Sequence, residues 1–477
     1  GSGASVQLIQ SEDMDTTLNR EMVESRGDGN YTWNGNIGQD EESSVVFTAM
    51  DNVVHGYISL GSESYTVEPL GGGQYTILQD EESLIPKDAD DAKAPDVDVL
   101  KQRFRSRRDS YSRTDDGSVI DVMVLYTDRL QTKYEKDLGS LIQHYVDLTN
   151  NSYENSKIQT KLRLVHTALF DDPAVMEAND IEDALYFITN SQKVIDLRDD
   201  HNADLVCLLR VYPGEGYCGL AFLMNSKAAG PHFESHAFSV VQVRPISEAD
   251  PKYCSDLTFA HEIGHNLGCS HDIENAEYAG TYEYSYGHDI VDKFATVMSY
   301  DRPRKLYFSN PNITFGGDAT GIVDAADNAR TINQTRIIAA NFRESPSTCN
   351  LLLSPSEKAF SNIGGNGTIS VMATSAFCPW NAVSYDPWID IVEGGGNRSG
   401  NGTVTYSVRQ NFNEGTRRSG SITVGDKTFQ VIQDPAAYTD GFESGDFSRL
   451  PWSVYSEGTP PCPFSPCPYT EGNWEVT

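Results

Sequence analysis

The stretch HEIGHNLGCSHD at residues 261–272 contains the side chains best suited to chemistry. On a helix, residues four apart share a face, so the imidazoles of His261 and His265 would project side by side. Gly268 can adopt the positive φ that ends a helix, and the chain could then turn and bring His271 to the same point. Three neutral imidazoles are typical ligands of a catalytic zinc ion, because they leave one coordination position open.

Glu262 directly follows the first histidine and would face a water molecule on the metal. The metal lowers the pKa of such a water toward neutrality, so a carboxylate can take its proton. HExxH alone occurs by chance in many helices, whereas the added glycine and third histidine make coincidence rare. A surface helix with solvated histidines is the alternative. The spacing therefore predicts zinc bound by His261, His265 and His271, with Glu262 as general base.

Strands and helices alternate around this motif and would position it. Runs of β-branched and apolar residues predict buried strands, and apolar residues at helical spacing predict helices. The strands are expected at 119–126, 160–165 and 203–211, and the helices at 141–153, 181–198 and 325–343. This alternation predicts a layered core of helices and strands over residues 117–346.

Residues 1–116 have a different character. Their alternating runs predict a small antiparallel β unit, with strands at 44–49, 53–60, 64–67 and 74–78. The first hundred residues contain 20 acidic and four basic side chains, a net charge of −16, and no cysteine. A basic run follows at 101–110, where Arg105, Arg107 and Arg108 predict either an exposed processing site or a solvated linker.

Charge and cysteine content limit the class of protein. The chain carries 69 acidic and 36 basic residues, a formal net charge of −33, which disfavours binding to DNA or RNA. No apolar run approaches the ~18 residues that a transmembrane helix needs. The eight cysteines all lie from Cys207 onward; an even number fits an exported protein with disulfides, and buried thiols in a cytosolic protein are the alternative. The chain starts without methionine, so we expect any signal peptide to have been removed.

The C-terminal part is rich in strand signals. Alternating runs separated by Gly- and Asn-rich turns predict a small β-sandwich over residues 350–436. Residues 437–477 hold six prolines but too few strand signals for a domain, so we expect an incomplete further module.

The motif at 261–271, together with the methionine in TVMSY at 296–300, resembles the metzincin metalloproteases. Asp272, directly after the third histidine, is similar to the reprolysin/adamalysin branch. The resemblance implies an α+β zincin-like catalytic domain with a mixed sheet. In it, Met298 would be an apolar floor beneath the zinc, Gly268 would end the active-site helix, and Asp272 would be a structural anchor.

The resemblance also assigns roles around the cleft. CGLAFL at 218–223 is similar to the family's exposed edge strand, so Gly219, Leu220, Ala221 and Phe222 would receive the substrate as an antiparallel strand. MSY resembles the Met-turn of astacins and serralysins, which makes Tyr300 either a transition-state stabiliser or a packing residue. The primed-side specificity pocket would be formed partly by residues 301–315.

Two disulfide pairs are expected on this basis. Cys218 and Cys254 flank the edge strand and the active-site helix, and we pair them. Cys462 and Cys467 are close enough in sequence to close a small loop.

The flanking units resemble known modules as well. GYI at 56–58 and YTVEPL at 65–70 are similar to reprolysin propeptides, which implies that residues 1–116 inhibit the enzyme. Because no cysteine precedes Cys207, inhibition would use a carboxylate, an imidazole such as that of His55, or occlusion of the cleft. Residues 350–436 resemble a BACON-type, Ig-like sandwich, for which a glycan or mucin partner is suspected, and residues 437–477 resemble the start of a lectin-like module.

These observations predict a secreted, extracellular bacterial zinc endopeptidase in its precursor form, with peptide or protein substrates. The alternative is a glycan- or mucin-binding adhesin with an inactive zincin domain, and the presence of Glu262 argues against it. No calcium-binding motif is present, and a calcium requirement is left open.

Overall fold

A computed structural model describes residues 5–10, 14–27, 30–38, 40–81, 84–86, 92–96, 98, 100, 115–176, 180–213, 216–227, 229–244, 252–343, 351–373, 378–396, 398–413 and 415–436. Some predicted features lie outside these residues: Arg105, Arg107, Arg108, Cys462, Cys467 and the segment 437–477. The domain boundaries inferred from the sequence stay predictions.

The N-terminal part forms one antiparallel sheet in which the seven strands follow each other in sequence order. The strands are β1 (Ser5–Gln10), β2 (Met14–Gly27), β3 (Asn30–Ile37), β4 (Asp40–Met50), β5 (Val53–Leu60), β6 (Glu63–Gly71) and β7 (Gln74–Gln79). Successive side chains of β5 point to opposite faces of the sheet and so reach two different cores. Ile58 packs with Trp33 in the core of the N-terminal sheet, and Tyr57 packs into the core of the central unit.

The central unit is built on a six-stranded mixed sheet in the order β10-β9-β11-β13-β12-β8. These strands are β8 (Ala92–Lys93), β9 (Val119–Tyr126), β10 (Lys161–Leu169), β11 (Leu205–Val211), β12 (Gly219–Phe222) and β13 (Phe238–Val243). The strand β9 coincides with the run predicted at 119–126, and it pairs in parallel with β10 and β11. The mixed sheet and its helices agree with the expected α+β content.

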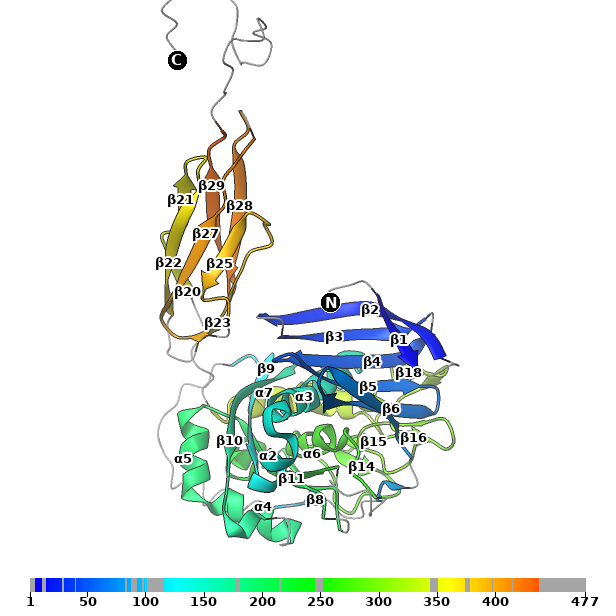
Figure 1. Cartoon of the computed structure of the whole chain (residues 1–477). Coiled ribbons are helices and arrows are strands. Elements are labelled where there is room, and N and C mark those ends of the chain that lie inside the picture. Colours follow the sequence, from blue (N-terminus) through cyan, green and yellow to red (C-terminus); the bar gives the residue numbers. More distant parts are fainter. Residues whose placement is uncertain are drawn as a thin grey trace, which may run out of the picture.

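Helices cover this sheet and connect its strands (Figure 1). They are α2 (Asp128–Tyr134), α3 (Leu138–Asn155), α4 (Ile181–Asn190), α5 (Gln192–Asp200), α6 (Thr258–Asn266) and α7 (Asn328–Ala339). The helix predicted at 181–198 is two helices, because Ser191 takes an extended conformation with ψ 115°. Among the described residues, no helix has the length and hydropathy that crossing a membrane requires.

The strand β8 comes from the N-terminal region and pairs in parallel with β12. The amide of Leu223 donates to the Lys93 carbonyl at 2.8 Å, which extends the pairing by one bond. In this form of the protein, β12 therefore lies between β13 and β8, and it is not the exposed edge strand that the sequence predicts.

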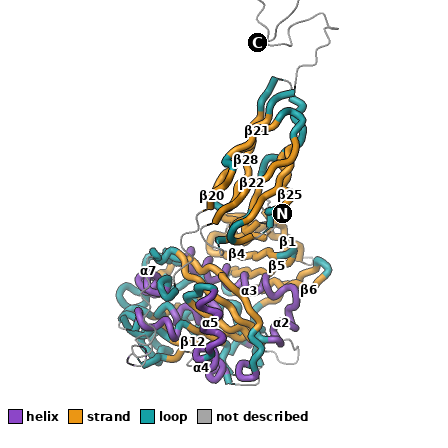
Figure 2. The backbone as a smooth tube through the Cα atoms, turned by 90° about the vertical axis from the view of Figure 1, so that its left-hand side faces the viewer, coloured by secondary structure: helices purple, strands orange, loops and turns teal. Residues whose placement is uncertain are grey.

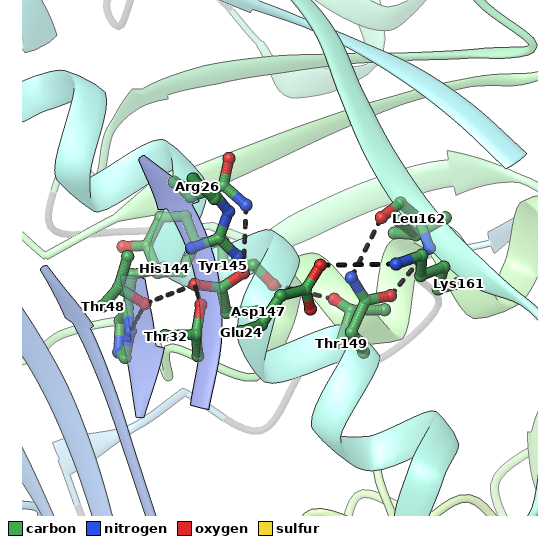
Figure 3. Close-up of polar contacts among 12 residues, drawn as sticks. Glu24, Arg26, Thr32, Thr48, His144, Tyr145, Asp147, Thr149, Lys161 and Leu162 are labelled. Carbon is green, nitrogen blue, oxygen red and sulfur yellow. Dashed lines mark hydrogen bonds and ion pairs between the residues drawn. The ribbon is translucent and has the colours of Figure 1, made fainter. Parts of the chain in front are cut away.

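One face of α3 supports the N-terminal sheet (Figure 3). The buried carboxylate of Asp147 accepts hydrogen bonds from Thr32 at 2.5 Å and Thr48 at 2.7 Å, and forms an ion pair with Arg26. His55 Nδ1 lies 3.1 Å from the hydroxyl of Ser140, two turns earlier on α3. Burial lowers the pKa of His55 to about 4, so this imidazole is neutral in the interface.

The described part of the C-terminal unit is a sandwich of two four-stranded sheets, β20-β22-β27-β25 and β21-β29-β28-β24 (Figure 2). The strands are β20 (Leu351–Ser354), β21 (Glu357–Phe360), β22 (Gly365–Ala373), β24 (Ala382–Val383), β25 (Ile389–Glu393), β27 (Gly402–Val408), β28 (Arg418–Val424) and β29 (Lys427–Gln433), with β23 (Pro379–Trp380) and β26 (Arg398–Ser399) as a separate pair. Trp380 belongs to the buried core and donates to the Gly400 carbonyl at 2.6 Å, so this indole is not a surface platform for sugars.

We expect Asp147→Ala to loosen the N-terminal sheet. The change leaves Arg26, Thr32 and Thr48 without a buried acceptor, and breaking a buried pair costs about 3 kcal/mol. The free energy of opening of β3–β5 should fall by that amount in amide hydrogen exchange. Lys161→Ala is the control, because its ion pair with Glu24 of the same sheet is exposed and should contribute less than about 1 kcal/mol. Equal effects of the two changes would contradict this account.

Candidate active site

The helix α6 and the turn after it position the three histidines. The helix ends at Asn266, and the chain then turns at Gly268, whose φ of +92° only glycine adopts readily. A Cβ on Gly268 would lie 2.0 Å from the hydroxyl oxygen of Thr281. The next residues form β14 (Ser270–Asp272), which pairs with β15 (Tyr286–Gly287). This turn returns His271 to the face of α6 that carries His261 and His265.

The imidazoles of the triad converge on one point. The Nε2 atoms of His265 and His261 are 3.2 Å apart, and those of His271 and His265 are 3.0 Å apart. All three side chains are buried, and their candidate ligand atoms lie within 4.8 Å of one another. Within the described residues this is the only cluster of histidine, cysteine and acidic side chains with the geometry of a metal site.

The hydrogen bonds at Nδ1 of His261 and His265 show that a cation fits between the Nε2 atoms of the two rings. His261 Nδ1 donates to the Val297 carbonyl at 2.8 Å, and His265 Nδ1 donates to the Cys269 carbonyl at 2.8 Å. A neutral imidazole that donates from Nδ1 has a lone pair on Nε2. Two such lone pairs face each other and would repel without a positive ion between them. The donor set therefore fits a metal ion that prefers nitrogen ligands, such as zinc.

Glu262 is fully buried beside the triad, and β12 makes room for it. A Cβ on Gly219 would lie 2.1 Å from Glu262 Oε1, closer than any real contact. The absence of a side chain at Gly219 therefore leaves the space that the carboxylate occupies. From the sequence, Gly219 is expected only on the substrate strand. Its contact with Glu262 joins residues too distant in sequence for any local pattern to reveal.

Met298 and Asp272 make contacts that support the elements carrying the triad. The sulfur of Met298 fills the space beside Gly264, where a Cβ would lie 2.4 Å from it. The carboxylate of Asp272 accepts from the Ser299 hydroxyl at 3.1 Å and from the Tyr300 amide at 3.2 Å. These contacts tie the strand that carries His271 to the segment that contains Met298.

A second carboxylate reaches the same serine. The Ser299 hydroxyl lies 2.9 Å from Asp289 Oδ1 as well as near Asp272, so it can donate to either carboxylate. Burial raises the pKa of Asp289 to about 6, and the nearby charges of Asp272 and Asp301 act in the same direction. Asp289 is not predicted from the sequence, because it has no motif spacing to the histidines.

The side chain of Tyr300 lies against the triad. Its hydroxyl oxygen is 2.9 Å from His271 Nε2, and its ring centroid is 4.3 Å from that of His271. His55, named in the sequence analysis as a candidate inhibitory imidazole, contacts Ser140 of α3 instead.

A disulfide links Cys218, before β12, to Cys254, before α6, with the Cα atoms 5.3 Å apart. This is the pair expected from the sequence. Cys207 and Cys269 are buried free thiols, and Cys378 is disulfide-bonded. Cys269 accepts the hydrogen bond of His265 at its backbone carbonyl and so orients that ring, and its thiol is not part of the histidine cluster.

The amino-acid sequence of this chain is similar to those of known proteins. Residues 116–314 match the Reprolysin_5 model of metallopeptidase family M12. A peptidyl-Asp metalloendopeptidase from Stenotrophomonas maltophilia is 30% identical over 353 residues, which cover 68% of this chain and 80% of the relative. A protein of the same name from Xanthomonas campestris is 27% identical, with 70% of this chain and 81% of the relative covered.

Other comparisons cover less or are more distant. A peptidyl-Asp metalloendopeptidase from Pseudomonas aeruginosa is 32% identical over 48% of this chain, and the chain spans only 42% of that relative's length. Among solved structures, metalloproteinase-II from Bacteroides fragilis aligns over 69% of this chain and 90% of its own, with 12% identity. The TM-score is 0.36, a value too low to establish a common fold.

We expect the metal-depleted chain to be stabilised by Zn²⁺. At a free concentration about 1,000-fold above the dissociation constant, binding to the folded state alone adds about 4 kcal/mol. Thermal unfolding with and without Zn²⁺, alongside the measured metal content, checks this. His265→Ala should abolish the shift, whereas His166→Ala, which removes a histidine stacked on His201 outside the triad, should retain it. A full shift in the His265 variant would disprove the assignment.

Proposed function

The chain belongs to metallopeptidase family M12, and from this premise we propose that it is a secreted zinc-dependent endopeptidase in its precursor form. The observation that supports the proposal most strongly is the convergence of three Nε2 atoms beside a buried carboxylate. His261, His265 and His271 would hold the ion, and Glu262 lies next to them without being part of the cluster.

Different residues of the chain have different roles in peptide hydrolysis. A bound zinc ion would polarise the scissile carbonyl and make the attacking water more acidic. Glu262 takes the proton of that water and later returns it to the departing amine. The hydroxyl of Tyr300, which lies beside His271 in this structure, donates to the oxygen that becomes negative in the transition state. The strand β12 aligns the peptide through backbone hydrogen bonds.

The substrate class follows from the relatives. Three of them carry the name peptidyl-Asp metalloendopeptidase. We assign to this chain the same chemical class, peptides that contain aspartate, cleaved at a bond next to that residue.

The N-terminal region would act as an inhibitor by occupying the position of the substrate. The strand β8 pairs with β12 in parallel, whereas the family resemblance implies that a substrate lies antiparallel to this strand. A chain that runs in the reverse direction presents its peptide bonds to the metal in the wrong orientation for attack. Lys93 adds an ion pair with Glu182 of α4 at 3.2 Å, which helps to hold β8 in place. Inhibition by occlusion therefore needs no thiolate ligand.

The alternative function, a glycan-binding adhesin with an inactive zincin domain, has less support. The carboxylate of Glu262 and the glycine that accommodates it are both present, and neither is needed in an inactive site. A glycan or mucin ligand for the C-terminal sandwich stays a prediction from the resemblance.

Glu262→Ala should abolish peptide cleavage while the chain still binds zinc, because the carboxylate moves a proton and is not a ligand. We expect kcat to fall by about 100-fold or more, within the range for a general base. Metal content and the thermal shift with Zn²⁺ should stay as in the unaltered chain. Glu274→Ala, an exposed acid near the triad, is the matched control. Cleavage at the normal rate by the Glu262 variant would refute its role.

Cutting the chain between residues 105 and 110 should raise peptidase activity. After the cut, the N-terminal sheet and β8 are no longer tethered to the enzyme and can leave β12 free. The measurement is the rate of hydrolysis of an Asp-containing peptide before and after an inserted protease site in this segment is cut. The same activity in both forms would show that residues 1–116 are not an inhibitor.

A further inference from the structure

We propose that Lys305 determines the substrate preference by binding an acidic side chain on the primed side of the scissile bond. The proposal rests on the proposed function and names the residue that would recognise the aspartate. In the precursor, the N-terminal sheet covers this lysine, so a substrate cannot reach it while the sheet is in place.

The backbone of Lys305 is tied to the segment that supports the triad. Its amide donates to the Ala295 carbonyl at 2.8 Å, and the amide of Val297 donates to the Tyr307 carbonyl at 2.8 Å. Val297 also accepts the hydrogen bond from His261 Nδ1. Lys305 therefore lies in the segment after the Met-turn, where the family resemblance implies the wall of the primed-side pocket. Only a few hydrogen bonds separate it from His261.

The side chain of Lys305 is buried by the N-terminal sheet. It is 1% exposed, and its ammonium group donates to the Ser59 hydroxyl at 3.1 Å and to the Gly61 carbonyl. Ser59 is on the same face of β5 as Tyr57, the face that packs into the central unit. When the sheet leaves, the ammonium loses both of these acceptors and becomes accessible to solvent and to a substrate.

The sheet also brings carboxylates to this surface, as an acidic substrate would. Glu42 accepts from the Gly316 amide at 2.8 Å, at the end of the expected pocket wall. Glu42 and Glu21 both help to raise the pKa of Tyr307, although burial is the larger cause. The surface around Lys305 is thus covered in the precursor by acceptors and negative charge.

Two other cations, one in the segment after the Met-turn and one that pairs with the N-terminal region, are less suited to this role. Arg304 donates to the Ser299 carbonyl at 2.8 Å and is committed to the turn below the triad. Arg244 forms an ion pair with Asp80 of the N-terminal region, but Asp256 of the central unit is another of its counter-charges and would remain after the sheet leaves. The two hydrogen-bond acceptors described for the Lys305 ammonium, the Ser59 hydroxyl and the Gly61 carbonyl, both belong to the N-terminal region.

The chemistry of recognition is a charge-assisted hydrogen bond. An ammonium group has three donors and can bind both oxygens of an aspartate side chain, whereas asparagine offers one neutral acceptor. A hydrogen bond to a charged group contributes enough to change kcat/KM by roughly 10- to 100-fold.

The test uses the full chain, cut at an inserted protease site between residues 105 and 110. Peptides that differ only in Asp, Asn or Lys at one position are compared by kcat/KM, and mass spectrometry identifies the bond that is cleaved. The variants are Lys305→Met, Lys305→Arg and Lys305→Glu. Lys161→Met is the matched control, because this lysine also pairs with the N-terminal sheet, through Glu24, but lies on β10.

We expect cleavage on the amino side of aspartate and a preference for Asp over Asn of roughly 10- to 100-fold. Lys305→Met should bring this ratio close to one by slowing cleavage of the Asp peptide far more than that of the Asn peptide, and Lys305→Arg should retain the preference. Lys305→Glu should favour the Lys peptide, a gain that a misfolded variant cannot show. The control should behave like the unaltered chain.

Three results would overturn the proposal. An unchanged Asp preference in Lys305→Met and Lys305→Glu would exclude Lys305 as its source. Cleavage on the carboxyl side of aspartate would place recognition on the other side of the bond. A cut chain that cleaves none of the peptides, although it binds zinc, would overturn the proposed function and this inference together.

Discussion

The architecture depends on keeping three imidazole lone pairs aimed at one point inside a dry protein. The Nε2 lone pairs of His261 and His265 face each other across 3.2 Å, a distance that two lone pairs tolerate only around a cation. Each ring must be held in one tautomer and one orientation, and backbone carbonyls do this for His261 and His265. The carbonyl of Val297 comes from the Met-turn and that of Cys269 from the turn after α6. Those two segments are therefore fixed wherever the site is functional.

Small residues in the site are explained by the same constraint. Gly264 lets Met298 approach the helix, and Gly219 leaves space for the carboxylate of Glu262. Gly268 supplies the positive φ with which the chain reverses. Gly264 and Gly219 thus each leave room for a larger side chain at the site. The packing around the site is set by the functional side chains, and the glycines are placed to accommodate them.

Hydrophobic periodicity and residue spacing predicted those parts of the structure that residues close together in sequence determine. The buried strand at 119–126 and the spacing of His261, His265 and His271 follow from periodicity, and both are present. The strands β1–β3 were missed, because their alternating residues are mostly polar and their pairing comes from the neighbouring strands. The two-residue strand β8 has no pattern of its own, since its partner β12 alone makes it a strand. The burial of Lys305 by Ser59 joins residues 246 positions apart, which no local window can reveal.

The placement of β8 on β12 has a consequence for how the proposed inhibition would depend on protein concentration. While the inhibitory strand belongs to the same chain, its effective concentration at the cleft is independent of how dilute the protein is. Once the connection is severed, association becomes bimolecular and obeys mass action. At high protein concentration the cut molecules would then remain inhibited, and the same molecules would become active on dilution into a large volume. Cutting the chain would thus convert a precursor that is inhibited at any protein concentration into an enzyme whose activity rises on dilution.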